Sequence, residues 1–340
     1  MNVAIDAQLT VGTATGIGEY VRGLVPALRR RGVDVVELRE PRLDPWRFDR
    51  RVLWDQCLLP VRARRSGASL LHCPAGTLPW IASLPLVATV HDVAWLAAQR
   101  HARAYARYYF GKFSLRRYRN AAQIIVDSQH ARTALLQFLK NFDGRRVAAI
   151  YPGVAHEFCS LERAAPDGRT ILAVGTIEPR KNLELLVRAL AHLPRARLVA
   201  VGPETPYAQR CMELAQRLGV AERVEMRGYE SRAAVLSLYR TSAVVAVPSL
   251  YEGFGYAAAQ ALCAGVPCVV SDRTSLPEVV GDAAPVVSLE DFGGWIAALR
   301  HALDGGDDVR AARERAAATT RFSWDAAAAA VERRYALAVQ

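Results

Sequence analysis

The chain has 340 residues, enough for two α/β domains, and its 51% hydrophobic and 23% charged residues are typical of a globular protein. It contains no C-x-x-C pair, no apolar run of the roughly 18 to 20 residues that span a bilayer, and no secretory signal pattern at its N-terminus. These absences argue against a disulfide-rich, membrane-spanning or secreted protein, so we expect a cytoplasmic protein with reduced thiols.

The formal net charge of +11 is confined to the first half of the chain. Residues 1–165 hold 24 Lys and Arg against 13 Asp and Glu, whereas residues 166–340 hold 20 of each kind. Such an asymmetry suggests that the first half faces an anionic partner.

The first half alternates short apolar strands with helices, which predicts a parallel sheet covered on both faces. Ser128 is the expected N-cap of one helix, because its hydroxyl can accept a free helix N–H. The expected strands are residues 3–7, 34–38, 70–73, 86–91, 123–127 and 147–151, and the expected helices are 19–31, 102–119 and 128–141.

The second half repeats this plan, so the fold class is α/β with two Rossmann-like, doubly wound domains. The predicted domains are residues 1–160 and 161–320, followed by a C-terminal helix in 321–340. Ligands of such sheets bind at the carboxyl ends of the strands. The expected strands are 170–174, 197–201, 223–226, 243–247, 267–271 and 284–287, and the helices are 182–193, 207–218, 232–240, 257–264, 291–303, 309–320 and 324–339.

One strand-to-helix turn, in the stretch PSLYEGFGYAAAQALCAG, carries an acidic residue between an apolar strand and an alanine-rich helix. Glu252 is followed by Gly253 and Gly255, and glycines there allow the backbone to approach a ligand closely. The free N–H groups and the dipole at the helix start favour phosphate. The alternative is an ordinary strand–loop–helix unit with a surface glutamate.

A second turn of this kind, GTIEPRKNLELLVRAL, places Arg180 and Lys181 where a helix begins. Cations are disfavoured at a helix N-terminus, so a bound anion would offset the cost of this arrangement. Two solvated charges are the alternative interpretation.

The first half contributes weaker signals. The glycine turn TGIGEY carries Gly16 and Gly18 after the first strand, although a lone G-x-G is as often a structural turn. His91 and His72 each end a strand, where ligand-contacting residues are expected. Either histidine could instead be structural.

The stretch YEGFGYAAAQALCAGVPCVVSD resembles the signature of the retaining glycosyltransferases of family 4. The resemblance implies the GT-B fold, in which two Rossmann-like domains face a cleft and the last helix, here after FSWD, packs back onto the first domain. The family carries a second glutamate eight residues after the first, and here that position holds Gln260. Glu19 stands where the family often has arginine in its TGIGRY turn.

The resemblance also implies roles for individual residues. Glu252 would contact the donor sugar, and Arg180 with Lys181 would hold the donor diphosphate. His91 would lie beside the sugar and the departing diphosphate. The implied catalytic residues are His91, Glu252, Arg180 and Lys181, and the implied donor-binding residues are Gly16, Gly18, Arg180, Lys181, Glu252, Gly253, Phe254, Gly255, Tyr256 and Gln260.

The function implied is transfer of a sugar, with retention, from a nucleotide-diphosphate sugar to a glycan or lipid-linked acceptor. The residues of these motifs most resemble those of bacterial mannosyltransferases of O-antigen or exopolysaccharide assembly, so GDP-mannose is the favoured donor. Without a D-x-D motif we expect no metal and no other cofactor. A GT-B sugar-nucleotide epimerase and a non-catalytic nucleotide-sugar-binding module are the alternatives.

Residues 100–119 interleave cations with aromatic residues, a pattern that suits an anionic lipid surface. We therefore hypothesise peripheral attachment to the inner face of the cytoplasmic membrane. A half-buried helix with a solvated basic face is the alternative, and no nucleic-acid-binding motif accompanies the charge, so nucleic acid is not an expected partner. The cations are Arg100, Arg103, Arg107, Lys112, Arg116, Arg117 and Arg119.

Overall fold

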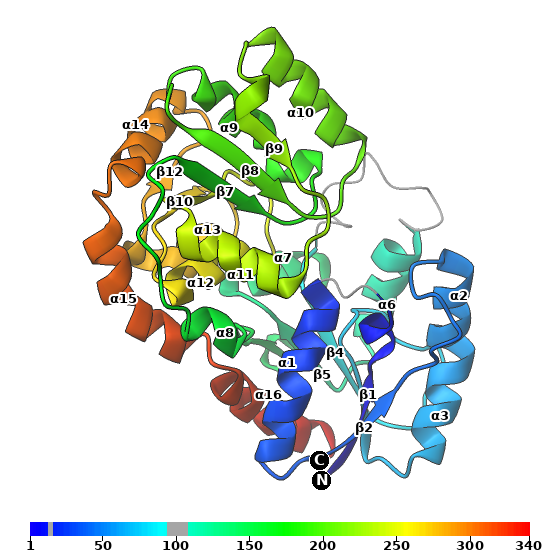
Figure 1. The fold of residues 1–340 in the computed structure, drawn as a ribbon. Helices are drawn as coiled ribbons and strands as arrows, with labels where there is room; N and C mark the ends of the chain where they lie inside the picture. The colour runs from blue at the N-terminus through cyan, green and yellow to red at the C-terminus, as the bar shows by residue number, and fades with distance from the viewer. Residues whose placement is uncertain (13–15, 94–107) are drawn as a thin grey trace. The chain divides into compact units, whose positions relative to one another are not determined.

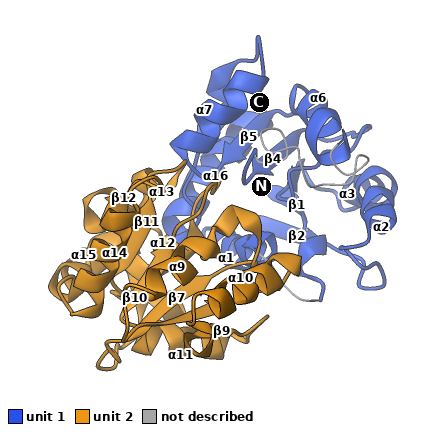
Figure 2. Ribbon diagram, turned by 90° about the horizontal axis from the view of Figure 1, so that it is seen from above, with its two compact units in different colours: residues 1–153, 323–340 blue, residues 154–322 orange. Residues whose placement is uncertain are grey.

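The computed structural model describes residues 1–12, 16–93 and 108–340, which form two compact units. Unit 1 comprises residues 1–153 and 323–340, and unit 2 comprises residues 154–322 (Figure 2). The chain thus enters unit 2 at Val154, before the predicted boundary at residue 160. The reason is a short helix, α8 (His156–Cys159), which packs on helix α12 (Tyr256–Ala264) of unit 2.

Unit 1 contains a six-stranded sheet in the order β2-β1-β3-β4-β5-β6, with every pair parallel. The strand order reverses between β1 and β3, and this switch point is where such sheets bind ligands. The strands are β1 (Asn2–Asp6), β2 (Asp34–Leu38), β3 (Leu70–Cys73), β4 (Leu86–Val90), β5 (Gln123–Val126) and β6 (Val147–Ala149).

The helices of unit 1 include two that the sequence pattern did not indicate, α2 and α3, joined by a π-helical turn at Trp54–Leu58. They lie in the long connection between β2 and β3 (Figure 1). Ser128 caps α7 as predicted, since its Oγ accepts a hydrogen bond from the Ala131 N–H. The helices are α1 (Gly16–Arg30), α2 (Phe48–Leu53), α3 (Leu59–Arg65), α6 (Ser114–Tyr118), α7 (Gln129–Phe138) and α16 (Trp324–Ala338).

The last helix, α16, packs on α1 and completes the core of unit 1, which confirms the predicted return of the C-terminus to the first domain. Two glycines make room for its first residue. A Cβ added at Gly23 or Gly153 would lie 2.0 Å or 2.4 Å from the Trp324 ring. Val331 and Tyr335 of the same helix are fully buried.

Unit 2 contains the second parallel sheet, in the order β12-β11-β10-β7-β8-β9. This is the strand order of dinucleotide-binding Rossmann folds, and it reverses between β7 and β10. The loops that follow these two adjacent strands therefore lie next to each other. The strands are β7 (Thr170–Val174), β8 (Arg197–Val201), β9 (Val224–Met226), β10 (Val244–Val247), β11 (Cys268–Ser271) and β12 (Val286–Val287).

Helices cover both faces of the second sheet, so its central strands are buried and read as continuous apolar runs. Two adjustments to the predicted bounds matter for the site. Helix α9 begins at Leu183, because Asn182 adopts a left-handed conformation, and α12 begins at Tyr256. The remaining helices are α9 (Leu183–Leu190), α10 (Pro206–Arg217), α11 (Arg232–Thr241), α13 (Leu276–Val280), α14 (Phe292–Leu303) and α15 (Asp308–Arg321).

The basic segment at residues 100–119 is described only from Tyr108 onward, so Arg100, Arg103 and Arg107 lie outside the described residues. The described part of the predicted helix is helical, with a π-helical stretch, Tyr108–Phe113, that leads directly into α6. Tyr109 and Tyr118 are buried, and Arg117 donates a hydrogen bond to the Pro79 carbonyl at 2.8 Å. The exposed cations of the described part are Lys112, Arg116 and Arg119.

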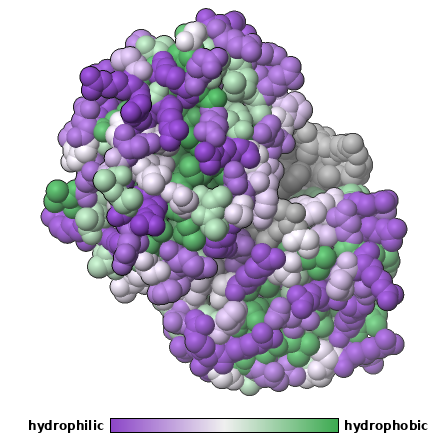
Figure 3. All heavy atoms as spheres, in the orientation of Figure 1, coloured by the Kyte–Doolittle hydropathy of each residue, from purple (hydrophilic) through white to green (hydrophobic). Residues whose placement is uncertain are grey.

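In the described parts of the chain, no helix combines the length and the apolar character needed to cross a bilayer. Hydrophilic and hydrophobic residues alternate over the face of the molecule drawn in Figure 3.

Candidate active site

Glu252 lies in the loop that connects β10 to α12, and its side chain is only 8% exposed. The Ser249 hydroxyl donates a hydrogen bond to Glu252 Oε1 at 2.7 Å. The backbone on either side of the carboxylate is also held, since the Glu252 N–H donates to Thr274 Oγ1 and Ser275 Oγ donates to the Glu252 carbonyl. The loop is therefore fixed by one hydroxyl of its own and by two from the loop between β11 and α13.

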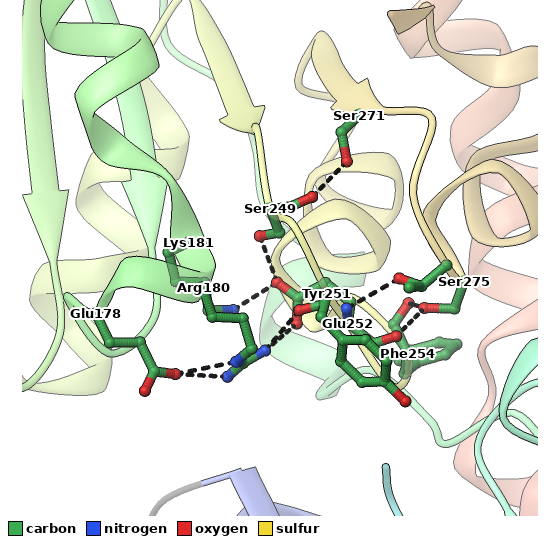
Figure 4. A network of polar contacts seen from close by, with 10 residues as sticks. Glu178, Arg180, Lys181, Ser249, Tyr251, Glu252, Phe254, Ser271 and Ser275 are labelled. Carbon is green, nitrogen blue, oxygen red and sulfur yellow. Dashed lines mark hydrogen bonds and ion pairs between the residues drawn. The ribbon is translucent and has the colours of Figure 1, made fainter. Parts of the chain in front are cut away.

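Arg180 and Lys181 lie in the loop between β7 and α9, and both point toward Glu252 (Figure 4). Lys181 Nζ is 2.6 Å from Glu252 Oε1, and Arg180 Nη1 is 3.0 Å from Glu252 Oε2. The backbones of the two loops also meet, because the Leu250 N–H donates to the Arg180 carbonyl at 2.8 Å. The strand switch point thus brings together two motifs that are about seventy residues apart in the sequence.

The two cations determine the ionisation of this carboxylate. Burial alone raises the pKa of Glu252, but Lys181 and Arg180 outweigh burial and lower the pKa below its usual value. Glu178 neutralises the other side of Arg180, with its Oε1 2.7 Å from Arg180 Nη2. The charges of two carboxylates and two cations therefore neutralise each other just before the N-terminus of α9.

Three glycines allow this close packing. Gly175 has a φ of +132°, and a Cβ there would lie 3.0 Å from the Lys181 side chain. A Cβ on Gly202 would lie 2.1 Å from the Gly175 carbonyl oxygen, so the ends of β7 and β8 approach as only glycines permit. Gly255 has a φ of +97° as the N-cap of α12, and a Cβ there would meet Leu276 at 2.7 Å.

The two residues after Glu252 differ in role: Gly253 has no side chain, and the side chain of Phe254 is buried. Gly253 follows Glu252 directly and lies before the start of α12. Phe254 is 3% exposed and packs edge-on against Tyr256 and Phe322, so its side chain belongs to the interior of unit 2. Phe254 therefore anchors the loop, and its carbonyl accepts a hydrogen bond from Ser275 Oγ at 2.9 Å.

Gln260 lies one turn into α12 and is half-buried. Its side-chain oxygen accepts a hydrogen bond from the hydroxyl of buried Tyr239 at 3.1 Å. This partner comes from α11 and gives no signal in the sequence.

His91, the proposed catalytic residue of unit 1, follows β4 and is held by a carboxylate. Its Nδ1 is 2.7 Å from Asp127 Oδ2, at the end of the adjacent strand β5. The ring also packs edge-on against Tyr20, with centroids 4.9 Å apart. His91 lines a cavity of about 100 Å³ together with Ile17, from the first turn of α1, and Gly76, from the loop after β3.

His72 is structural rather than ligand-lining. It is fully buried, its Nδ1 is 2.6 Å from the Tyr335 hydroxyl of α16, and its Nε2 is 2.7 Å from Thr89 Oγ1. Gly16 and Gly18 occupy the first turn of α1 at this same end of the sheet. Gly16 adjoins residues 13–15, which lie outside the described residues.

Sequence reasoning missed several members of these sites, namely Ser249, Thr274, Ser275, Tyr239 and Asp127. Asp127 had the clearest signal, because it directly follows a strand whose carboxyl end lies beside that of β4. No sequence pattern distinguished the two serines, the threonine or the tyrosine. Within the described ranges, no three His, Cys, Asp or Glu side chains gather as they would around a metal ion.

Two family models match the chain and together cover most of it. The model described as "Glycosyltransferase Family 4" matches residues 14–158, and the model described as "Glycosyl transferases group 1" matches residues 162–318. The first match falls mostly within unit 1. The second lies within unit 2 and includes Arg180, Lys181 and Glu252.

Among curated proteins, the chain is similar to the D-inositol 3-phosphate glycosyltransferase of Mycolicibacterium smegmatis, with 32% identity over 219 residues. That match covers 60% of this chain and 50% of the relative, so the chain spans about half the length of the curated relatives it matches. Mannosyltransferases are absent from the relatives described above, so the favoured mannose donor stays a prediction.

Solved structures share the fold across nearly the whole chain. Sucrose-phosphate synthase from Thermosynechococcus elongatus has a TM-score of 0.78 at 22% identity and covers 99% of this chain and 98% of its own. HepE from Anabaena, solved in complex with UDP-glucose, has a TM-score of 0.76 at 17% identity and covers 99% of both chains. The fold is therefore GT-B, as predicted, and the chain belongs to the group 1 glycosyl transferases, with a family 4 glycosyltransferase first domain.

Proposed function

We propose that the protein transfers a sugar, with retention of anomeric configuration, from a nucleotide-diphosphate sugar to an acceptor. The observation that carries the proposal is the bridge from Glu252 to Lys181 and Arg180, at the strand switch point of unit 2. Nucleotides bind at this place in parallel sheets of this strand order. The membership of the chain in a glycosyltransferase family supports the same reaction.

The residues at this point suit a diphosphate leaving group. A departing nucleotide diphosphate gains negative charge, and fixed cations stabilise such charge most when they are positioned before the reaction. Lys181 is only 17% exposed and is anchored by a carboxylate, so little reorganisation is needed. The start of α12 lies next to Glu252 and adds the positive end of its helix dipole.

Glu252 has a second role in this proposal. When the diphosphate binds, its oxygens compete with Glu252 for Lys181 and Arg180, and the carboxylate becomes available to accept hydrogen bonds from sugar hydroxyls. Exchange of one anion for another keeps the two cations neutralised throughout. Ser249 holds Glu252 in place during that exchange.

GDP-mannose is the donor that the motif resemblance implies. UDP-glucose is the necessary comparison, because it is the ligand named for the Anabaena structure that shares this fold. We propose a glycan or lipid-linked acceptor in cell-surface polysaccharide synthesis, and a reaction that needs no metal.

Attachment to an anionic membrane surface is a separate part of the proposal. Lys112, Arg116 and Arg119 are the exposed cations of the described part of the basic segment, although Arg119 also donates to the Lys140 carbonyl, whereas Arg117 is buried. Changing the three exposed cations to serine should therefore reduce co-sedimentation with anionic vesicles at low salt. Equal recovery of the wild-type protein with neutral and anionic vesicles would rule the attachment out.

A donor screen tests the reaction. The protein is incubated with GDP-mannose, UDP-glucose and related donors, with and without candidate acceptors, and the released nucleotide diphosphate and the anomer of the product are measured. Glu252→Gln should abolish most turnover. Glu225→Gln is the matched control, because Glu225 lies in the same unit and pairs with Arg227 at the surface.

Two outcomes would contradict the proposal. Interconversion of the donor sugar without transfer would indicate an epimerase. Binding of the donors, seen as a thermal shift, without turnover by any acceptor would indicate a nucleotide-sugar-binding module.

A further inference from the structure

A buried histidine–carboxylate pair lies at the carboxyl ends of β4 and β5 in unit 1. His91 Nδ1 and Asp127 Oδ2 are 2.7 Å apart, and their side chains are 17% and 2% exposed. Parallel pairing of Val90 with Val126 sets the two strand ends side by side, so the backbone fixes this contact. The pair is therefore a rigid part of the sheet.

The second polar atom of each side chain does not take part in the contact between His91 and Asp127. His91 Nε2 is buried and makes no hydrogen bond among the described residues, and neither does Asp127 Oδ1. Buried polar atoms without partners are uncommon, and each one calls for an explanation. His91 also lines the cavity of about 100 Å³ in unit 1, so the histidine borders a space that a ligand can enter.

Asp127 also selects the tautomer of the ring. With Nδ1 donating to a carboxylate, a neutral His91 must carry its proton on Nδ1 and present Nε2 as an acceptor. When the ring is protonated, Nε2 becomes a donor and the Nδ1 contact is unchanged. The carboxylate thus leaves Nε2 as the only ring atom whose hydrogen bonding changes with pH.

Among the described residues, four ionisable groups act on the ring or pack against it. Asp127 and Asp92 are acidic, Tyr20 packs against the ring from α1, and His72 of β3 interacts with it electrostatically. Burial alone lowers the pKa of His91, but the charge and hydrogen bond of Asp127, together with the charge of Asp92 and the Pro74 backbone, outweigh burial and raise the pKa above its usual value. Burial lowers the pKa of His72 to about 3, so this neighbour is neutral near pH 7.

We propose that Asp127 is a positioning residue of the transferase: it orients His91 and holds its protonated form, so that Nε2–H donates to an oxygen of the bound substrate. The inference rests on the proposed function and deepens it, because it names the group that sets the orientation and charge of His91. Asp127 itself touches no substrate.

The first test does not depend on activity. Ring resonances of His91 are followed by NMR from pH 5 to 9 in the wild type and in Asp127→Asn, which keeps the shape and the acceptor oxygen but removes the charge. The expected result is a fall in the pKa of His91 by about one unit, a tenfold change in its proton affinity. His192, on the surface of unit 2, is the internal control. An unchanged His91 titration would overturn the proposal.

The second test uses the reaction. If His91 acts as a donor, kcat falls as the pH rises through its pKa, and in Asp127→Asn this fall begins at lower pH while KM changes little. Asp127→Ala, which also loses the orientation, should lower kcat at every pH. A residue that only stabilised the fold would reduce the amount of active protein and leave the shape of the pH profile unchanged.

The double variant separates the two roles further. In a His91→Gln background, Asp127→Asn should change kcat by less than about twofold, because coupled residues lose their function together. Independent, multiplicative losses would contradict a positioning role. If no donor is turned over by the wild type, the proposed function fails, while the NMR titration still decides whether Asp127 controls His91.

Discussion

Lys181 Nζ lies 2.6 Å from Glu252 Oε1, and this contact joins the two strongest motifs of the sequence into one site. The family resemblance implies a separate ligand for each motif, namely a diphosphate for the cations and a sugar for the carboxylate. In the structure each is the counter-charge of the other. Any change to one of them therefore alters the electrostatics of both.

Lys181→Ala and Arg180→Ala should each lower kcat about a hundredfold, since loss of one electrostatic donor to a developing anion costs on the order of 3 kcal/mol. Each variant also leaves Glu252 with one cation fewer, so its pKa should rise. The measurement is kcat with the best donor from the screen. Arg188→Ala is the control, because Arg188 is an exposed cation of α9. Full activity in the Arg180, Lys181 double variant would refute the assignment.

Gln260→Glu should leave donor affinity equal or tighter, measured by calorimetric titration with the nucleotide diphosphate. A carboxylate accepts hydrogen bonds from ribose hydroxyls more strongly than an amide. It can also keep the bond that Gln260 accepts from Tyr239, so the helix should not be disturbed. Loss of binding in a variant that unfolds like the wild type would show that Gln260 does not face the ribose.

Activity should persist in excess EDTA. The expectation follows from the missing D-x-D motif and from the two cations already placed at the proposed diphosphate site. The assay compares initial rates before and after chelation, then after addition of magnesium or manganese. Restoration of a lost rate by either metal would contradict this prediction.

Arg51→Leu should destabilise unit 1 by about 3 to 5 kcal/mol near pH 8, because it leaves two buried carboxylates without a cation. Arg51 pairs with Asp6 at 3.1 Å and with Asp55 at 2.8 Å. Burial already raises the pKa of Asp55 to about 6, so protonation should relieve part of the loss at pH 5.

The measurement for Arg51→Leu is the denaturant midpoint at pH 5 and at pH 8. Arg50→Leu, which changes an exposed neighbour, should show little loss at either pH. An equal loss for Arg51→Leu at both values would mean that the buried carboxylates do not control it.

His72 should make unit 1 sensitive to acid. Burial lowers its pKa to about 3, whereas in the unfolded chain it takes up a proton near pH 6.5. The unfolded state therefore binds more protons as the pH falls below about 6.5, and the free energy of unfolding decreases by up to about 1.4 kcal/mol per pH unit.

His72→Gln should remove this part of the pH dependence while lowering stability at pH 7, because its bonds to Tyr335 and Thr89 are weakened. Hydrogen exchange of β3 between pH 4 and pH 7 gives the readout for unit 1. His192→Gln changes a surface histidine of unit 2 and should leave the slope as in the wild type.

Residue patterns were enough to predict the α/β class and the two parallel sheets, and the family resemblance implied the return of the last helix. Apolar strands and amphipathic helices are local patterns, and FSWD marks the start of that helix. The sequence also indicated Glu252, Arg180 and Lys181, because they stand at glycine-bearing turns that allow close approach to a ligand and because these turns resemble those of the family 4 glycosyltransferases. The helices at Phe48–Leu53 and Leu59–Arg65 were missed, since a π-helical turn interrupts their periodicity.

Only the tertiary structure decided which of these residues meet. The strand order of the second sheet places β7 beside β10, and this adjacency turns two motifs into one ion-pair network. The pairing of β4 with β5 likewise joins His91 to Asp127. Strand order follows from packing of the whole chain, and it cannot be read from the residues of any single strand. Contacts between distant residues therefore had to come from the folded molecule.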